Sequence, residues 1–537
     1  MSASLPDIGT DPAAIRRAAA RRRTFAVISH PDAGKSTLTE ALALHAHVID
    51  EAGAVHGKSG RAGVTSDWMG MERQRGISVT SAALQFEYRD CILNLLDTPG
   101  HADFSEDTYR VLSAVDCAIM LLDSAKGLEP QTLKLFDVCR HRDLPVITFI
   151  NKWDRPGREA LDLLDEIEHR LGIRPTPVTW PIGISGQFQG LVDRRVPDEA
   201  VRFTRSARGA TAAAEEHVPI DSDATGLSWL AHARDELELL SGIGADHDHD
   251  AFLAGRATPV FFGAAVSNIG VRLLLDAVVD LAPAPSARPT ADGGAVPVDE
   301  SFSGLVFKVQ ANMDPAHRDH IAFVRVCSGV FERGMTLTHM ATGRPFTTKY
   351  AHTMFGRERT SVDRAYPGDI VGLVNASALR PGDTLTDGRT LEFPPMPVFA
   401  PEHFATVRTT DTSRSKQFRK GIAQLEAEGA VQVLTSDHRG GQAPVLAAVG
   451  PMQFEVVLYR LENEFGTPAK IEMLPYRIAR RTDKPSGDWL ARSRGVEVLT
   501  RSRDGDLLAL FTDEWRLNAL HRERPELVLD PLVAQLT

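Results

Sequence analysis

Five short apolar runs in the first half of the chain each stop at a polar or glycine-containing motif. The runs are TFAVIS (24–29), CILNLLD (91–97), CAIMLLD (117–123), PVITFI (145–150) and PVFFG (259–263). Helix-length segments separate them, which is typical of a parallel sheet built from βαβ units and buried on both faces. Ligands bind at the carboxyl ends of the strands in such sheets. We therefore expect the motifs that follow these runs to form one ligand site.

The motif after the first run, SHPDAGKS (29–36), matches the phosphate loop G-x-x-x-x-G-K-[ST] at every defined position except the first, where Ser29 replaces Gly. Backbone N–H groups of such a loop wrap the phosphates, and the N-terminus of the next helix adds positive potential. Lys35 is expected to reach the terminal phosphates and Ser36 to offer its hydroxyl to Mg²⁺. A chance glycine-rich turn would not explain the strand before the loop and the helix after it.

DTPGH (97–101) follows the second run. An Asp at the end of a strand can hold Mg²⁺ through water, and this is the role that we expect for Asp97. Gly100 has no side chain to block a phosphate, so its backbone N–H could sense one, and His101 could polarise a water. An isolated DTPG is usually a simple turn, so this interpretation depends on the phosphate loop that precedes it.

NKWD (151–154), after the fourth run, is expected to select the base. The Asp154 carboxylate can accept two hydrogen bonds from guanine, whose N1–H and exocyclic amine form a donor pair that adenine lacks. Asn151 would support the loop and the base, and the stem of Lys152 would cover the face of the base. The backbone N–H of Ala265 is expected to reach guanine O6. The first domain is therefore predicted to bind a guanine nucleotide.

The segment MERQRGISVT (71–80) lies between the phosphate loop and DTPGH. It is polar and turns at Gly76, so it is well placed to be ordered by a terminal phosphate and released on hydrolysis. Ser78 could supply a hydroxyl to Mg²⁺. Without the neighbouring motifs, this segment would indicate only a loop that leads into an edge strand.

The length and pattern of the apolar segments change at a proline-rich stretch, APAPSARPTADGGAVP (282–297), which indicates a linker. Short alternating segments punctuated by Gly and Pro then predict a small antiparallel barrel. The order strand, helix, strand, strand, helix, strand that follows is typical of a ferredoxin-like domain, with Pro451 at the first position of the second helix. We expect a lead-in with a short helix (1–20), an α/β P-loop GTP-binding domain (21–290), a β-barrel domain (291–392) and an α+β ferredoxin-like domain (393–537).

Composition restricts the partners and the compartment. The chain has 60 Lys and Arg against 71 Asp and Glu, a net charge of −11, which argues against non-specific binding of nucleic acid by the whole surface. No apolar stretch reaches the ~20 residues that span a bilayer, and the N-terminus lacks the apolar core of a secretory signal. The four cysteines are scattered, with no CxxC pair, as in a reducing compartment. We expect a cytoplasmic protein with no membrane or DNA partner.

Together the motifs resemble those of the translational GTPases, and their amino-acid sequences are similar to those of the release factor 3 family. The resemblance extends from about residue 21 to about residue 475. The segments that carry it are SHPDAGKST, SDWMGMERQRGISVT, DTPGHADFSEDTYR and VQANMDPAHRDHIAFVRVCSG. Elongation factor G shares DTPGH and NKxD but has two further domains, and elongation factor Tu is considerably shorter. The expected domain order agrees with the release factor 3 family.

The resemblance implies a monomeric, ribosome-stimulated GTPase that binds GTP or GDP with Mg²⁺, contacts ribosomal RNA and proteins, and promotes removal of class-one release factors. His101 would position the attacking water once ribosomal RNA docks beside it, and Lys35 would be the second catalytic group. The residues expected at the nucleotide are Asp32, Ala33, Gly34, Lys35, Ser36, Thr37, Gly100, Asn151, Lys152, Asp154, Ala264 and Ala265, and those expected at the metal are Ser36, Ser78 and Asp97. Ser78 stands where elongation factors have Thr, and Ala264 where Ser is usual.

Other interpretations stay open at this point. The chain could be another ribosome-binding GTPase, such as an elongation, protection or stress factor, whereas a metabolic P-loop kinase conflicts with NKWD. DHDHD (246–250) indicates an acidic solvated loop rather than a metal site. A basic run indicates a solvated helix face, with a ribosomal contact as the alternative. This run consists of Arg408, Arg414, Lys416, Arg419 and Lys420.

Overall fold

A computed structural model describes residues 9–46, 83–196, 198–204, 213–220, 227–311, 320–355, 358–396, 399–436 and 443–532. The central sheet of the first domain has the strand order β2-β3-β1-β4-β5-β11-β6, in which only β2 is antiparallel to its neighbour. The strands are β1 (Arg22–Ser29), β2 (Ala83–Tyr88), β3 (Cys91–Asp97), β4 (Cys117–Asp123), β5 (Val146–Asn151), β6 (Arg174–Pro177) and β11 (Ala257–Phe262). The five predicted parallel strands are confirmed, and β2 and β6 are additional.

Helices cover both faces of this sheet because successive side chains of a buried strand point to opposite faces. Phe25 and Val27 pack with α2 and α9, whereas Ala26 and Ile28 pack with α4, α5 and α6. The helices are α1 (Pro12–Ala20), α2 (Lys35–His45), α4 (Ser105–Leu112), α5 (Pro130–His141), α6 (Ala160–Leu171) and α9 (Val271–Leu281). The predicted short helix in the first twenty residues is therefore confirmed as α1.

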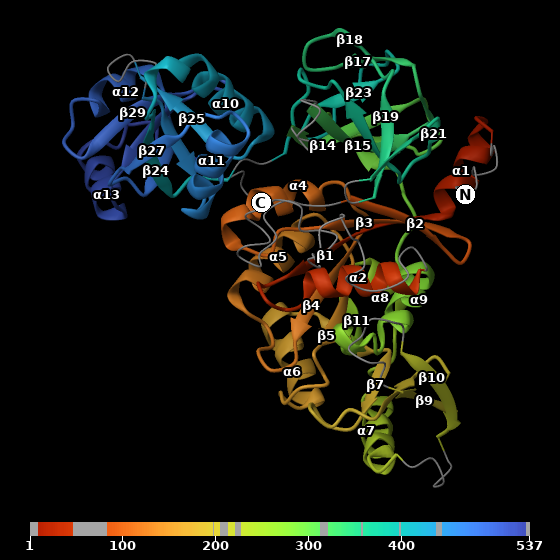
Figure 1. Cartoon of the computed structure of the whole chain (residues 1–537). Helices are drawn as coiled ribbons and strands as arrows, with labels where there is room; N and C mark the ends of the chain where they lie inside the picture. The colour runs from red at the N-terminus through yellow and green to blue at the C-terminus, as the bar shows by residue number, and fades with distance from the viewer. Residues whose placement is uncertain are drawn as a thin grey trace.

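A second small sheet, which we call the insert, stands between β6 and β11 in the chain and projects away from the barrel domain (Figure 1). It has the antiparallel order β10-β9-β8-β7. Its strands are β7 (Thr179–Ile182), β8 (Gly190–Asp193), β9 (Glu199–Thr204) and β10 (Ala214–Pro219), and α7 (Leu230–Gly242) and α8 (His249–Leu253) follow. Within DHDHD, Asp248 caps α8 by accepting a hydrogen bond from the Ala251 N–H at 2.9 Å.

The barrel domain consists of short antiparallel strands around one apolar core. These are β14 (Ser303–Ala311), β15 (His320–Ser328), β17 (Thr336–His339), β18 (Arg344–Thr347), β19 (Ala351–Phe355), β20 (Glu358–Ser361), β22 (Ile370–Val374) and β23 (Thr384–Thr386), with the two-residue pairs β12 (Arg288–Pro289) with β13 (Ala295–Val296) and β16 (Phe331–Glu332) with β21 (Arg364–Ala365). The buried Arg325 fastens the barrel to the first domain, because its guanidinium donates to Asp116 and to the Ala114 carbonyl, each at 2.7 Å.

The third domain contains the same element order twice. The first unit is β24 (His403–Thr409), η5 (Thr412–Arg414), α10 (Ser415–Glu428), β25 (Gln432–Thr435), β26 (Val445–Ala448), α11 (Met452–Asn463) and β27 (Ala469–Met473). This is the predicted ferredoxin-like order, but Pro451 is the N-cap of α11 and not its first residue, one position earlier than predicted. The second unit is β28 (Ile478–Thr482), α12 (Lys484–Leu490), β29 (Val496–Arg501), β30 (Leu507–Phe511), α13 (Glu514–Glu523) and β31 (Asp530–Pro531). Pairing of β25 with β29 joins both into one sheet.

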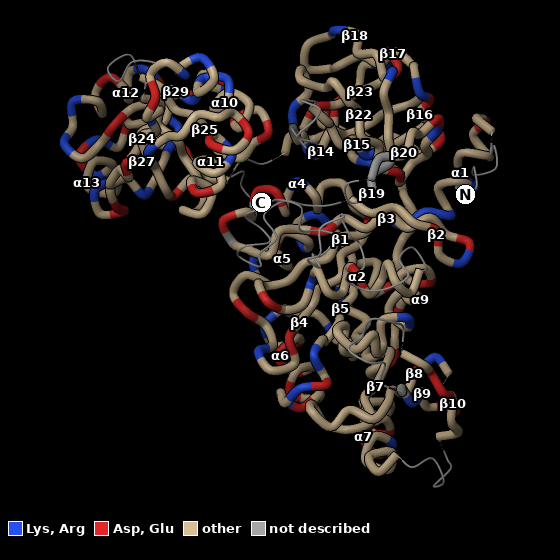
Figure 2. The backbone as a smooth tube through the Cα atoms, viewed as in Figure 1, with Lys and Arg blue, Asp and Glu red and all other residues tan. Residues whose placement is uncertain are grey.

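Charges of both signs are spread over all three domains (Figure 2). On α10, Phe418, Ile422 and Leu425 face the core, and the residues of the basic run are exposed. Among the described residues, no helix is both long enough and apolar enough to cross a bilayer.

Candidate functional site

The phosphate loop connects the end of β1 to α2, as the sequence predicts. Asp32 and Gly34 both have a positive φ, 65° and 97°, which turns the backbone sharply before the helix begins at Lys35. Gly34 has to be glycine for a second reason, because a Cβ there would lie 2.6 Å from Nδ2 of Asn151. Ser36 and Thr37 are half-buried in the first turn of α2. The loop therefore places backbone N–H groups and a helix N-terminus together, as phosphate binding needs.

Lys35 and Asp97 form an ion pair across the carboxyl ends of β1 and β3. The distance from Lys35 Nζ to Asp97 Oδ1 is 2.7 Å, and the two side chains are only 6% and 2% exposed. The other oxygen, Asp97 Oδ2, is buried and has no hydrogen-bond partner among the described residues. A buried carboxylate oxygen without a partner is costly unless it receives one. This free carboxylate oxygen is a suitable ligand for Mg²⁺, which prefers oxygen ligands.

Asn151 joins the phosphate loop to the two predicted base-binding loops. Its Nδ2 donates to the carbonyl of Ala33 at 2.8 Å, and its Oδ1 accepts from the N–H of Ala265 at 2.9 Å. The supporting role expected of Asn151 thus has a direct geometric basis. The Ala265 N–H, which is expected to reach guanine O6, is already bonded to Asn151 Oδ1. A guanine O6 would have to share this N–H with Asn151 or replace Asn151 as its acceptor. Ala264 is buried at the start of the same loop.

Lys152 crosses from the base-binding loop to the phosphate loop. It has a φ of 65°, and its Nζ donates to the carbonyl of Asp32 and, at 2.8 Å, to the carboxylate of Asp123. Burial alone would raise the pKa of Asp123, but hydrogen bonds from Lys152 and the Ala125 backbone lower it. These contacts fix the end of the Lys152 side chain between Asp32 and Asp123, and Asp154 is half-buried.

His101 follows Gly100, which lies against Pro31 and Lys35 of the phosphate-loop region. His101 Nδ1 accepts a hydrogen bond from the N–H of Asp103 at 3.2 Å and lies 3.1 Å from the Asp103 carboxylate. These residues belong to the turn and η1 (Ala102–Phe104) that lead into α4.

The Asp103 carboxylate also reaches the third domain. Its Oδ2 accepts a hydrogen bond from the N–H of Met452 at 2.7 Å, at the N-terminus of α11, where a carboxylate is stabilised by unpaired N–H groups and the helix dipole. Asp103 therefore links the segment that carries His101 to the C-terminal domain.

Two site residues, Asp103 and Asp123, were not predicted from the sequence. Asp123 carries the same signal as Asp97, since each is the last residue of a buried strand. Asp103 has no local signal, because its partner lies 349 positions further along the chain. Ser78 and the segment 71–80 lie outside the described residues.

His30, inside the phosphate loop, is buried and contacts Glu129 through Nδ1. Burial lowers the pKa of His30, although the Glu129 carboxylate opposes this shift. A histidine whose pKa lies below its ordinary value of 6.5 is mostly neutral at pH 7. The positive charge that the site offers to phosphate therefore comes from Lys35 and the backbone N–H groups.

Three family models match consecutive parts of the chain. The Elongation factor Tu GTP binding domain matches residues 20–284, Elongation factor G domain 2 matches residues 301–388, and the Class II release factor RF3, C-terminal domain, matches residues 393–521.

The similarity to curated relatives spans almost the whole chain. Peptide chain release factor 3 of Synechococcus elongatus is 49% identical over 523 residues, which cover 96% of this chain and 93% of the relative. The proteins of the same name from Trichodesmium erythraeum and Gloeobacter violaceus are 47% and 48% identical, with 96% and 94% of this chain and 96% of each relative covered.

A crystal structure of a Thermus thermophilus protein superimposes with a TM-score of 0.68 at 20% identity. The match covers 91% of this chain and 72% of that chain, and at this identity it concerns the fold alone.

Proposed function

Since the chain belongs to the peptide chain release factor 3 family, we propose that it is a ribosome-stimulated GTPase that removes class-one release factors from the ribosome during translation termination. The match of residues 393–521 to the C-terminal domain of this family carries the proposal. Elongation factors share the nucleotide motifs, so the first two domains alone would not favour termination over elongation.

The first domain is a GTP-binding domain of a GTPase, and its geometry suits phosphoryl transfer to water. Catalysis of this reaction is mainly positioning and charge stabilisation. Lys35 would leave Asp97 for the terminal phosphates, and Ser36 and Asp97 would hold Mg²⁺. When bound, Mg²⁺ neutralises charge on the phosphate oxygens. Asp154 would accept hydrogen bonds from guanine, and Asn151 would keep the base-binding and phosphate loops in register.

His101 would orient the attacking water after the ribosome has docked. In the free protein, His101 Nδ1 accepts from the Asp103 backbone, and Asp103 in turn binds the third domain. This supports a resting state in which the segment that carries His101 is held in place by contacts within the protein. We therefore expect slow GTP hydrolysis by the protein alone and strong stimulation by ribosomes.

The charge distribution supports a transient ribosomal contact. With a net charge of −11, global attraction to ribosomal RNA is weak, whereas local basic patches such as the exposed basic run on β24, η5 and α10 can still dock. Such a protein can bind and then leave. We expect it to act as a monomer in the cytoplasm, without a DNA or membrane partner.

The test is release-factor removal from terminated ribosomes that carry a labelled class-one release factor. The expected result is that the protein with GTP accelerates departure of the label, whereas the protein with GDP does not. Lys35→Ala, which removes the phosphate-contacting ammonium, is the control variant and should be inactive. Ribosome-stimulated GTP hydrolysis without faster departure of the label would instead favour an elongation, protection or stress factor.

A further inference from the structure

Trp153, the third residue of NKWD, is buried against the insert. Its side chain is 1% exposed and lies in an apolar cluster with Trp180, Ile182 and Leu191 of the insert. The indole Nε1–H donates to the carbonyl of Gly183, directly after β7, at 3.1 Å. The loop that is expected to select guanine is therefore anchored to the insert through a side chain.

The backbone of the same loop is held by the same part of the insert. The Gly186 N–H donates to the Trp153 carbonyl at 2.9 Å, and the Ser185 hydroxyl donates to the Arg155 carbonyl at 2.7 Å. Gly157 lies so close to this loop that a Cβ would be 2.7 Å from Ser185 Oγ. Residues 183–187, which we call the clamp loop, thus contact both the side chain and the backbone of the base-binding loop.

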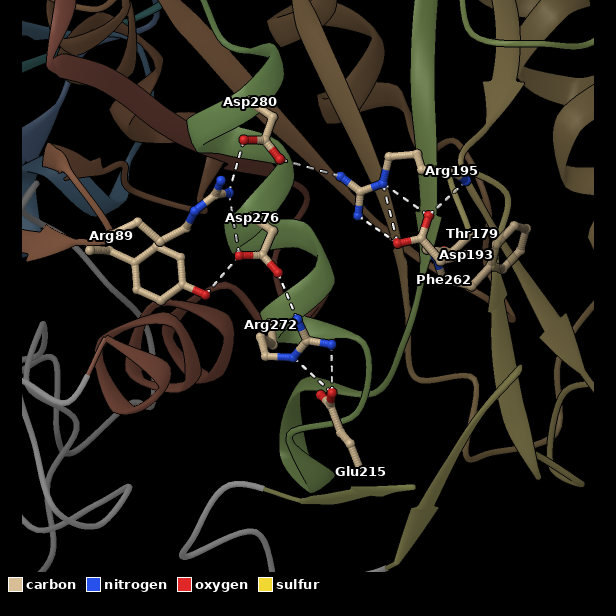
Figure 3. A network of polar contacts seen from close by, with 10 residues as sticks. Arg89, Thr179, Asp193, Arg195, Glu215, Phe262, Arg272, Asp276 and Asp280 are labelled. Atoms are coloured by element: carbon tan, nitrogen blue, oxygen red, sulfur yellow. Dashed lines mark hydrogen bonds and ion pairs between the residues drawn. The ribbon is translucent and has the colours of Figure 1, made fainter. Parts of the chain in front are cut away.

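The second base-binding loop, 263–268, is attached to the insert through the elements on either side of it (Figure 3). Before the loop, the Phe262 N–H donates to the Thr179 hydroxyl of β7 at 3.0 Å. After the loop, Arg272 at the start of α9 pairs with Glu215 of β10. The backbone N–H of Trp153 donates to the Gly263 carbonyl at 3.1 Å, and this bond joins the two base-binding loops directly. Both predicted base-binding loops, NKWD and 263–268, are therefore attached to the insert.

We propose that Trp153 is a positioning residue and that the insert, through the clamp loop, sets how long a guanine nucleotide stays bound. Release of the base requires the NKWD loop to move away from it. This movement must break two hydrogen bonds of Trp153, one from its indole N–H to the Gly183 carbonyl and one from the Gly186 N–H to its own carbonyl. Because these bonds are buried with Trp153, breaking them is costly. Displacement of the insert would lower this barrier from a distance, so the insert is a control point for nucleotide exchange. The inference concerns the isolated protein and does not depend on release-factor removal.

The test uses Trp153→Phe in the full-length protein, loaded with a fluorescent GDP and chased with excess GDP. The Trp153 ring packs edge-on against Phe262. Phenylalanine keeps an aromatic ring there but cannot donate to Gly183. Loss of one buried hydrogen bond changes a rate or equilibrium constant that depends on it by roughly several-fold to tenfold. We therefore expect GDP to dissociate about five- to tenfold faster. Single-turnover hydrolysis of saturating GTP should be unchanged, because the phosphate site keeps its contacts.

Trp180→Phe is the matched control. Trp180 is also buried, its ring also packs edge-on against Phe262, and its indole donates to Glu236 at 2.9 Å. That bond lies within the insert and its helix α7 and does not touch the NKWD loop. GDP should therefore dissociate from Trp180→Phe at the wild-type rate, whatever the variant does to thermal stability.

Ser185→Ala tests the clamp loop through a partly exposed residue and should accelerate dissociation by a smaller factor. Unchanged GDP dissociation in both Trp153→Phe and Ser185→Ala would overturn the proposal. Equal acceleration in Trp153→Phe and Trp180→Phe would also overturn it, because the effect would then follow from packing of the insert rather than from the bond to Gly183. If Trp153→Phe fails to fold, Ser185→Ala measured against Trp180→Phe decides the question.

Discussion

At the residue scale, the nucleotide site is held by side chains that reach across the ends of strands. Lys35 pairs with Asp97 and Lys152 with Asp123, so each predicted phosphate- or base-contacting lysine has a carboxylate partner at the end of a neighbouring strand. Lys152 and Asp32 adopt a positive φ, a conformation that costs non-glycine residues of order 1 kcal/mol and that clusters at functional sites. The local strain and the charge pairing therefore coincide at the loops that the motifs identify.

Replacing Asp154 with Asn should convert the base preference. The carboxylate would lose its paired acceptor role toward guanine, and hydrogen bonds to a charged group are worth about 1.5–3 kcal/mol each, so GTP affinity should fall by roughly 100-fold. Affinity for xanthosine triphosphate should rise. Equilibrium binding of both nucleotides measures the change, with Asp162→Asn on the exposed face of α6 as control. Retained GTP selectivity would contradict the base assignment.

Replacing His101 with Ala should leave GTP binding intact and abolish ribosome-stimulated hydrolysis. A positioned acid–base or water-orienting group contributes about 10²–10⁴-fold to rate, and a loss of this size is expected in single-turnover hydrolysis with ribosomes. His141→Ala, at an exposed histidine of α5, is the control. Stimulated turnover at the wild-type rate would remove the role assigned to His101.

At the scale of elements, the third domain shows how short segments are combined. Each of its two units has the order strand, helix, strand, strand, helix, strand, and in each unit the first strand pairs with the third and the fourth. In the first unit, the helices α10 and α11 are joined by an ion cluster in which the Arg460 guanidinium lies 2.8 Å from Glu428 and 2.7 Å from Glu464. Arg460 and Glu428 are less than a tenth exposed.

Replacing Arg460 with Ala should strongly destabilise the contact between α10 and α11. It would leave the buried Glu428 without its partner, and breaking a buried pair costs about 3–5 kcal/mol. Hydrogen exchange in the two helices measures this loss of free energy of unfolding. A variant that combines Arg460→Met with Glu428→Leu and Glu464→Leu should lose much less, since no charge is then buried unpaired. Equal losses in both variants would mean that the charges are not responsible.

Several elements could not be predicted because they are too short to carry a pattern. The strands of the insert are only four to six residues long, and runs of that length do not distinguish strand from helix or loop by periodicity. The second unit of the third domain has a similar problem, because its exposed helices α12 and α13 present few apolar positions. The five apolar runs of the first domain are also short, but they are nearly uninterrupted and each ends at a polar or glycine-containing motif, and this combination predicted their strands.

At the scale of the whole molecule, α4 is the place where the three domains meet. Arg110 of α4 donates to Glu106 at 2.5 Å and to the Gly429 carbonyl of the third domain at 3.3 Å. Lys308 of the barrel domain lies 4.0 Å from Asp107. A cavity lined by all three domains remains between these groups. Because only η1 separates His101 from α4, we expect movement of the segment that carries His101 to be transmitted to both other domains.

Replacing Gly450 with Ala should weaken the contact between the first and third domains. A Cβ at this position would overlap the Asp103 carboxylate, which would have to leave the N-terminus of α11 and lose a bond worth about 1.5–3 kcal/mol. Energy transfer between labels on α6 and α13 should report a larger or broader separation, with GDP affinity unchanged.

Gly487→Ala in α12 is the matched control, since a Cβ there meets no atom closer than 3.5 Å. It should leave the separation at the wild-type value. An unchanged separation in Gly450→Ala would show that Asp103 does not hold the two domains together.

The sequence by itself determined the parallel sheet and the motifs at its strand ends, and it predicts phosphate and guanine recognition by those motifs. These depend on local spacing, because a strand, a glycine-rich turn and a helix N-terminus are formed by neighbouring residues. Only the tertiary structure decided that Asp103 binds α11, that Trp153 is clamped by the insert, and that β25 and β29 join two units into one sheet. These contacts depend on packing and register between distant segments, which no local pattern encodes.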